Sequence, residues 1–187
     1  MTRDPHAVTL PADHTWWRVA DTAWADPLDP TWADRTGGRW NAPGDGPTLY
    51  LNADVETARA QVPRMLLGTA VDPEDLRDDA PFVLVPVALP ARQRVADATT
   101  DTGLVALGLP RTYPRRPRGG EVPWSACRRA ARDVRAAGLR GVSARSAATL
   151  DGSGRELAWF PASGARARAS GPTLDFAEWR HGADGPG

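Results

Sequence analysis

Glycine and proline interrupt this chain so often that it must form many loops around a modest core. The sequence contains 18 glycines and 18 prolines among 187 residues, about a fifth of the chain, where average proteins have roughly 12%. This share stays below the roughly 25–30% that marks disorder. Hydrophobic residues make up 41% of the chain, so we expect one independently folding domain over residues 16–180, between flexible ends at 1–15 and 181–187.

Short apolar runs bounded by turn-forming residues predict strands. They lie at residues 16–19, 48–51, 82–89, 139–142, 156–160 and 174–179. Pro86 within the third run requires an edge position or a bulge. One helix is expected from Asp54, with Asn52 or Asp54 as its N-cap, until Pro63 kinks or ends it. A second is expected from Val122 to Ala137, before the stop at Gly138. Strands outnumber helices and do not alternate strictly with them, which favours an α+β fold.

The charged residues and cysteine argue against several kinds of function. All 23 basic side chains are arginine, balanced by 23 acidic ones. Without lysine there is no Schiff-base amine and no phosphate-binding loop ending in Gly-Lys-Ser/Thr. A neutral net charge argues against direct binding of nucleic acid. A single cysteine and three scattered histidines offer no metal-ligand spacing, so no metal is expected. No apolar run reaches the ~20 residues of a membrane span, and we expect a cytoplasmic protein.

The segment richest in chemical signals is Gly37-Gly38-Arg39-Trp40-Asn41-Ala42-Pro43-Gly44, followed by Tyr50. Its residues allow two interpretations. The first is a glycine-rich turn with an exposed arginine. The second is a ligand site, in which the paired glycines let a ligand approach the backbone and Arg39 grips an oxyanion bidentately. Trp40 and Tyr50 would then offer flat faces to a ring.

These residues resemble the RES-domain family. The motifs that match in order are Trp17-Arg18-Val19, the block at residues 37–44, Tyr50 and Arg145-Ser146-Ala147, and the resemblance spans residues 16–160. It implies a fold like that of ADP-ribosyltransferases, with split or mixed central sheets flanked by helices. Characterised members degrade NAD, and many are toxins of bacterial toxin–antitoxin pairs. Several cleave NAD with phosphate to nicotinamide and ADP-ribose 1''-phosphate, and a few transfer ADP-ribose to a protein.

The resemblance also implies a site built around NAD as substrate, with inorganic phosphate as a second substrate. Arg18 and Arg39 would hold the pyrophosphate or the incoming phosphate. Tyr50 would stack on the nicotinamide side, and Ser146 would hydrogen-bond the ribose or the phosphate. The expected partner is a cognate antitoxin. Assembly into a homo-oligomer is a further alternative. The residues expected to bind the dinucleotide are Arg18, Gly38, Arg39, Trp40, Asn41, Tyr50 and Ser146.

One position departs from the family pattern. Eleven residues after Tyr50 the family has a glutamate, whereas this chain has Gln61. Glutamine can hydrogen-bond a ribose hydroxyl, but it lacks the charge that steadies an oxocarbenium-like state, and losing such a group in a dry site costs about 3 to 4 kcal/mol. Either turnover is slow or a different acid serves. Glu121, Glu156 and Glu178 can reach a pocket from the second half of the chain, although a solvated or structural role is favoured for each.

The resemblance, together with the departure at position 61, implies three functions. The leading one is an NAD phosphorylase or other NAD-degrading toxin that cleaves the nicotinamide–ribose bond. The others are a catalytically weakened module that binds NAD or ADP-ribose and acts through a protein partner, and a protein mono-ADP-ribosyltransferase. The residues expected to carry catalysis are Arg39, Tyr50, Gln61 and Ser146.

Overall fold

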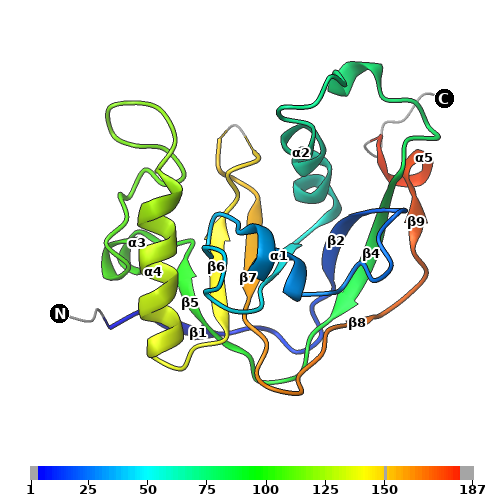
Figure 1. Cartoon of the computed structure of the whole chain (residues 1–187). Coiled ribbons are helices and arrows are strands. Elements are labelled where there is room, and N and C mark those ends of the chain that lie inside the picture. The colour runs from blue at the N-terminus through cyan, green and yellow to red at the C-terminus, as the bar shows by residue number, and fades with distance from the viewer. Residues whose placement is uncertain (1–3, 150, 182–187) are drawn as a thin grey trace.

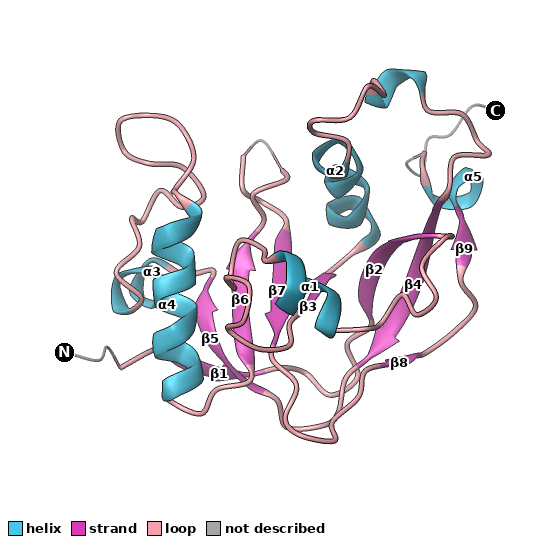
Figure 2. Ribbon diagram, in the orientation of Figure 1, coloured by secondary structure: helices cyan, strands magenta, loops and turns pink. Residues whose placement is uncertain are grey.

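The computed structural model describes residues 4–149 and 151–181, shown in Figure 1. Its strands are β1 (Ala7–Thr9), β2 (Trp16–Asp21), β3 (Leu49–Asn52), β4 (Phe82–Ala88), β5 (Arg94–Ala98), β6 (Gly141–Arg145), β7 (Arg155–Trp159), β8 (Arg168–Ala169) and β9 (Leu174–Asp175). Its helices are α1 (Thr31–Thr36), α2 (Val55–Met65), α3 (Asp101–Ala106), α4 (Trp124–Ala136) and α5 (Phe176–Trp179), with a 3₁₀ turn at Pro73–Asp75. Figure 2 shows helices flanking a sheet, which confirms the α+β prediction.

The strands form one mixed sheet in the order β1-β5-β6-β7-β3-β2-β4-β8, with β9 beside β4. Neighbouring strands are antiparallel, except that β5 and β6 run parallel. The sheet is nearly divided between β2 and β3, which share one backbone pair, Trp17 with Asn52. At this break, side chains replace the missing ladder. Arg18 Nη1 donates to the Tyr50 carbonyl at 2.9 Å, and Asn52 Nδ2 donates to the Trp17 carbonyl at 3.3 Å.

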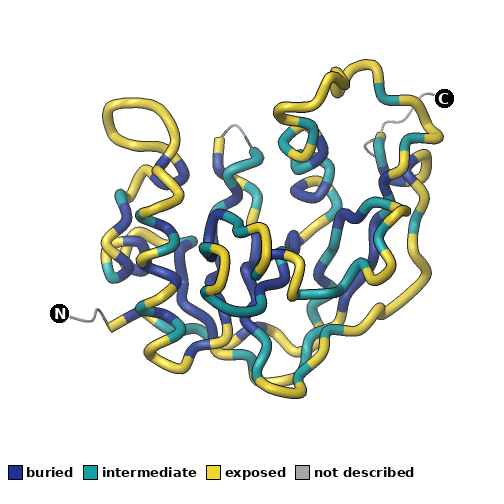
Figure 3. The backbone as a smooth tube through the Cα atoms, in the orientation of Figure 1, coloured by how far each residue is buried: buried dark blue, intermediate teal, exposed yellow. Residues whose placement is uncertain are grey.

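Buried side chains form three clusters. In Figure 3 the buried residues, coloured dark blue, run along the central strands. Alternate residues of a strand face opposite sides of its sheet. Val95 and Leu157 therefore belong to a cluster on one face, whereas Ala96 and Ala158 belong to the cluster under α4 on the other. The third cluster lies under α2 and α5 on the far side of the break. The cluster under α4 and the cluster under α2 and α5 are thus separated by the break between β2 and β3.

The two long helices follow their sequence signals. Asp54 caps α2 by accepting a hydrogen bond from the Thr57 amide at 2.6 Å. Helix α2 passes through Pro63 and ends at Met65, two residues beyond the expected limit. Helix α4 ends before Gly138, whose φ of 74° is one that glycine adopts without strain.

Pro86 occupies a position where its missing N–H costs no ladder bond. The N–H and C=O of one strand residue point to the same side, and the Pro86 carbonyl accepts from the Ser170 amide at 2.9 Å. Ser170 lies in the gap between β8 and β9, on the outer side of β4. Pro86 therefore turns its missing donor toward a break in the edge of the sheet, as the sequence required.

The predicted strand at residues 174–179 is wrong beyond Asp175. The Asp175 amide donates to Glu178 Oε2 at 2.6 Å within a capping box, which starts the short helix α5. Phe176 and Trp179 are both buried, and residues three apart share one face of a helix. The apolar pair thus has helical spacing rather than the alternation of a strand.

Ordered structure begins earlier than the expected start at Trp16. Strand β1 pairs with β5, and Leu10 is buried against the core, so the segment at residues 1–15 expected to be flexible contains a strand. Strand β5 and helix α3 have no counterpart in the sequence prediction. Residues 1–3 and 182–187 of the two expected flexible ends lie outside the described residues.

Candidate functional site

A cleft of about 480 Å³ opens where the sheet divides, within the roughly 300–1,000 Å³ of small-molecule sites. Three arginines line it: Arg18 from β2, Arg39 from the glycine-rich loop and Arg64 from α2. Burial lowers the pKa of Arg18 to about 10, so its guanidinium stays charged at neutral pH. Glu156 of β7 adds one carboxylate to the lining. The cleft is therefore suited to a ligand with several negative charges.

Tryptophan side chains form the outer walls of the cleft. The rings of Trp24 and Trp32 are stacked with centroids 6.4 Å apart, and the Arg18 guanidinium lies 5.3 Å from the Trp24 centroid. On another wall, the Arg39 guanidinium lies 5.8 Å from the centroid of Trp124. Trp32 and Trp124 are 51% and 46% exposed. Flat faces and guanidinium groups thus alternate around the opening, an arrangement that accepts both rings and phosphates.

Arg39 and Arg64 converge on one anion. Arg39 is 7% exposed, and its Nη2 donates to Glu121 Oε2 at 2.7 Å. Arg64 Nη1 donates to Glu121 Oε1 at 2.8 Å. A carboxylate therefore already spans the two guanidinium groups, which shows that this place accepts a negatively charged oxygen group. Sequence reasoning missed Arg64, although it lies three residues after Gln61 and hence on the same face of the helix.

Replacing Glu121 by glutamine is expected to reduce stability in a pH-dependent way. The Arg64 hydrogen bond, aided by Arg39, lowers the pKa of Glu121 from 4.5 to about 2. Because the folded pKa is lower, the carboxylate stabilises the fold above pH 4.5, and this contribution is lost as pH falls toward 2. Thermal melting of wild type and Glu121→Gln should show a gap at pH 7 that closes between pH 5 and pH 2. A gap independent of pH would contradict this role; the exposed Glu74→Gln is the control.

Tyr50 holds the glycine-rich loop in place. Its hydroxyl donates to Asn41 Oδ1 at 2.7 Å and accepts from the Trp40 amide at 2.8 Å. Its ring lies so close to Gly38 that a Cβ there would stand 2.4 Å from the hydroxyl oxygen. Position 38 therefore requires glycine, because a larger side chain would overlap Tyr50. Tyr50 also lines the cleft, so one side chain both fixes the loop that carries Arg39 and presents a surface to a ligand.

Tyr50→Phe is expected to lower the free energy of unfolding by about 2 kcal/mol, because the Trp40 amide and Asn41 each lose a partner. For a chain of this length the melting temperature should fall by about 4–8 °C. Tyr113→Phe is the matched control, since the buried Tyr113 hydroxyl has no hydrogen-bond partner in the described part of the chain. Equal melting temperatures for the two variants would show that the Tyr50 hydroxyl does not hold the loop.

Three predicted site residues lie behind the cleft rather than on its surface. Trp40, Asn41 and Ser146 are fully buried and are not among its lining residues. Asn41 Nδ2 donates to the Ala33 carbonyl at 2.6 Å, and the Trp40 ring packs against Tyr113. These contacts position the loop from behind. Gly38, Arg39, Tyr50, Gln61 and Arg18 do line the cleft together.

Gln61 and Ser146 meet at a residue that the sequence did not favour, Glu156. Gln61 Nε2 donates to Glu156 Oε2 at 3.2 Å, and Ser146 Oγ donates to the same oxygen at 3.4 Å. Burial raises the pKa of Glu156, whereas Arg39 and the Gln61 amide act in the opposite direction. Position 61 therefore faces a carboxylate carried by another element of the fold.

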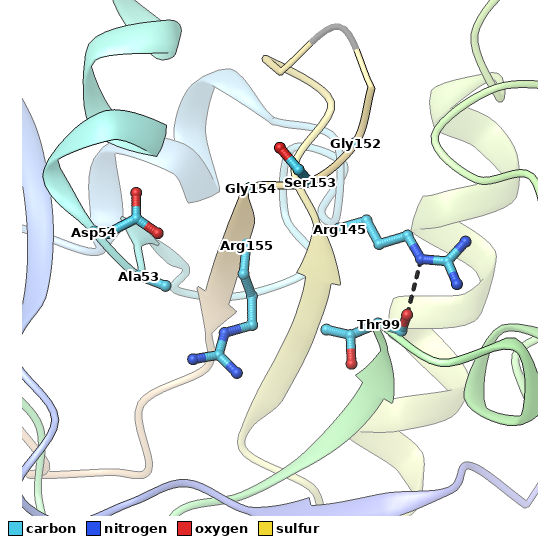
Figure 4. Close-up of a pocket in the computed structure, with 8 residues that line it drawn as sticks. All are labelled: Ala53, Asp54, Thr99, Arg145, Gly152, Ser153, Gly154 and Arg155. Atoms are coloured by element: carbon cyan, nitrogen blue, oxygen red, sulfur yellow. Dashed lines mark hydrogen bonds between the residues drawn. The ribbon is translucent and has the colours of Figure 1, made fainter.

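Arg145, adjacent to Ser146, lies elsewhere. It borders a second hollow of about 380 Å³, shown in Figure 4, together with Asp54, Thr99 and Arg155. Its guanidinium donates to the Thr99 carbonyl at 2.8 Å and to Asp101 at 2.9 Å. Arg145 thus ties the end of β6 to the start of α3 and takes no part in lining the cleft.

Within residues 4–149 and 151–181, no group of three or more His, Cys, Asp and Glu side chains is placed to hold a metal ion. None of the described helices is long and apolar enough to cross a membrane.

The fold and the cleft define an α+β protein with an anion-accepting, tryptophan-walled cleft at a break in its sheet. Residues 15–177 match the family model of the RES domain, and the chain belongs to the RES-domain family. The sequence comparison with curated proteins gives no match. Among solved structures, a chain in the crystal structure of the M. tuberculosis MbcT–MbcA toxin–antitoxin complex matches with a TM-score of 0.69 and 22% identity, covering 92% of this chain and 91% of that one. That similarity confirms the fold.

Proposed function

We propose that the protein binds NAD in the cleft and degrades it by breaking the nicotinamide–ribose bond. The observation that carries this proposal is the convergence of three arginines, tryptophan faces and one carboxylate in a single cleft. Guanidinium groups hold phosphate oxygens bidentately, and aromatic faces accept flat rings. A carboxylate in a water-poor site stabilises the positive charge that develops on a ribose as its glycosidic bond breaks. Membership of the RES-domain family supports NAD as the substrate.

The second substrate that fits the cleft best is inorganic phosphate. As the C1''–N bond breaks, its electron pair goes to the nicotinamide, which leaves as a neutral molecule. A phosphate oxygen then forms the new bond to C1'', giving ADP-ribose 1''-phosphate. Arg39 and Arg64 share the Glu121 carboxylate, and a phosphate that displaces this carboxylate would meet the same two guanidinium groups. The oxocarbenium-like charge would develop on a ribose held in the same cleft that Glu156 lines.

The direct test is to mix purified protein with NAD, with and without phosphate, and to measure released nicotinamide by chromatography. We expect release that increases with phosphate concentration. Release without phosphate dependence would indicate hydrolysis, and ADP-ribose on an added protein would indicate ADP-ribosyl transfer. Measurable NAD binding without release over hours would contradict the enzyme proposal and leave a binding module.

We also propose that the protein acts as the toxin of a toxin–antitoxin pair whose antitoxin covers the cleft. The similarity to a chain of a toxin–antitoxin complex supports this, as do the exposed apolar side chains of Trp32, Leu67 and Trp124 around the cleft. Expression in a bacterium should lower cellular NAD and stop growth, and the product of an adjacent small reading frame should restore both. Unchanged NAD on expression would contradict the toxin role.

A further inference from the structure

We infer that Glu156, on strand β7, is the catalytic carboxylate of this chain, and that Gln61 and Ser146 are the positioning residues that hold it. The inference deepens the proposed function and rests on it, because it assigns the acid that faces the ribose in the same cleft. The carboxylate would thus come from a central strand of the sheet, rather than from position 61 of helix α2.

The backbone of Glu156 is fixed on both sides. It pairs with Asn52 of β3 and with Ala144 of β6 in the middle of the sheet. Its side chain lines the cleft but is only 8% exposed. A ligand seated in the cleft can therefore touch a carboxylate whose position is set by two neighbouring strands.

Two side chains from different elements orient this carboxylate. Gln61 of α2 donates at 3.2 Å and Ser146, just after β6, donates at 3.4 Å, both to Oε2. The Ser146 hydroxyl is itself fixed, since it accepts from the Ala148 amide at 3.1 Å. A glutamine at position 61 therefore has a defined task, because its amide can donate to a neighbouring carboxylate, whereas an ionised glutamate could not.

Three other carboxylates, Glu121, Glu178 and Glu56, are engaged elsewhere or lie away from the cleft. Glu121 is held by Arg39 and Arg64. Glu178 accepts from the amide that starts α5. Glu56 lies on the exposed side of α2. Among the described residues that line the cleft, Glu156 is the one acidic side chain.

The surroundings favour an electrostatic role for Glu156. Glu156 is only 8% exposed, so its charge is weakly screened and acts strongly on a cation that forms beside it. Burial raises the pKa of Glu156, and Arg39 and the Gln61 amide limit this rise. No proton needs to be transferred, because nicotinamide leaves as a neutral molecule once it takes the bond pair.

The experiment compares three variants by nicotinamide release at saturating NAD and by calorimetric binding of ADP-ribose. Glu156→Gln keeps the shape and removes the charge, and we expect kcat to fall by about a hundredfold to a thousandfold while the affinity for ADP-ribose changes less than about threefold. Combining Gln61→Glu with Glu156→Gln moves the carboxylate across the 3.2 Å contact and should recover at least about tenfold of the lost rate. Glu56→Gln, on the same helix, is the control and should match wild type.

A Glu156→Gln variant with kcat within threefold of wild type would overturn the inference while leaving NAD degradation intact, and a folded double variant no faster than Glu156→Gln would also contradict it. If wild type itself releases no nicotinamide, the proposed function fails together with the inference. Should Glu156→Gln not fold, Glu156→Asp replaces it, since it keeps the charge but withdraws it by one methylene. We expect at least about a tenfold loss of kcat for this variant, and wild-type kcat would overturn the inference.

Discussion

Replacing Arg39 by alanine is expected to lower the rate of nicotinamide release by about a thousandfold, the upper end of what one preorganised group contributes in a dry site. The Arg39 guanidinium is 7% exposed, lines the cleft and bonds an anion at 2.7 Å. Interactions between charges are strong where water is excluded. Arg39→Lys should recover little of the rate, because an ammonium lacks the planar fork that reaches both the Val122 carbonyl and an oxyanion.

The measurement is steady-state release of nicotinamide, with thermal melting to establish that each variant folds. Arg129→Ala is the matched control, because Arg129 is an exposed arginine of α4 away from the cleft. A folded Arg39→Ala variant with turnover near that of Arg129→Ala would contradict a role for Arg39 in the reaction.

Gly38→Ala is expected to lower the free energy of unfolding by about 3 kcal/mol, since overpacking alone costs about 1–3 kcal/mol and the displaced hydroxyl loses hydrogen bonds. The added Cβ would stand 2.4 Å from the Tyr50 hydroxyl oxygen and 2.7 Å from its ring. Tyr50 cannot move aside without breaking its bonds to the Trp40 amide and Asn41. The melting temperature should fall by about 6–12 °C, and ligand binding should weaken because Arg39 follows directly in the chain.

The control for this variant is Gly171→Ala. A Cβ at Gly171 would meet its nearest neighbour, a Pro86 side-chain carbon, at an ordinary 3.4 Å. We expect its melting temperature to stay within about 2 °C of wild type, in line with the small effects of ordinary surface changes. Equal melting temperatures for Gly38→Ala and Gly171→Ala would show that the loop has room to relax.

The sequence predicts those elements whose ends carry strong local signals. Asp54 and Gly138 mark the start of α2 and the end of α4, and the structure confirms both. The segment at residues 174–179 misled the prediction because its aromatic residues suggested a strand, while the capping pair Asp175 and Glu178 specified a helix. Strand β5 carries little hydrophobic signal of its own and gains its structure from pairing with β1 and β6.

The sequence predicts which motifs belong to the candidate site, but it does not predict which of their side chains contact distant residues. The glycine-rich block and Tyr50 are close in sequence, and their contact follows from one turn and one strand. The contact between Gln61 and Glu156 joins residues 95 positions apart. It depends on the register of β3 against β7, which places Asn52 opposite Glu156. No local pattern encodes that register, so the partner of Gln61 could be found only in the folded chain.

Arg18 serves the structure of the sheet and the cleft at the same time. Its guanidinium replaces the missing backbone ladder between β2 and β3 and also lines the cleft. A substitution that adapts position 18 to a new ligand therefore also alters the joint between the halves of the sheet. Ligand specificity and the stability of the fold are therefore coupled at position 18.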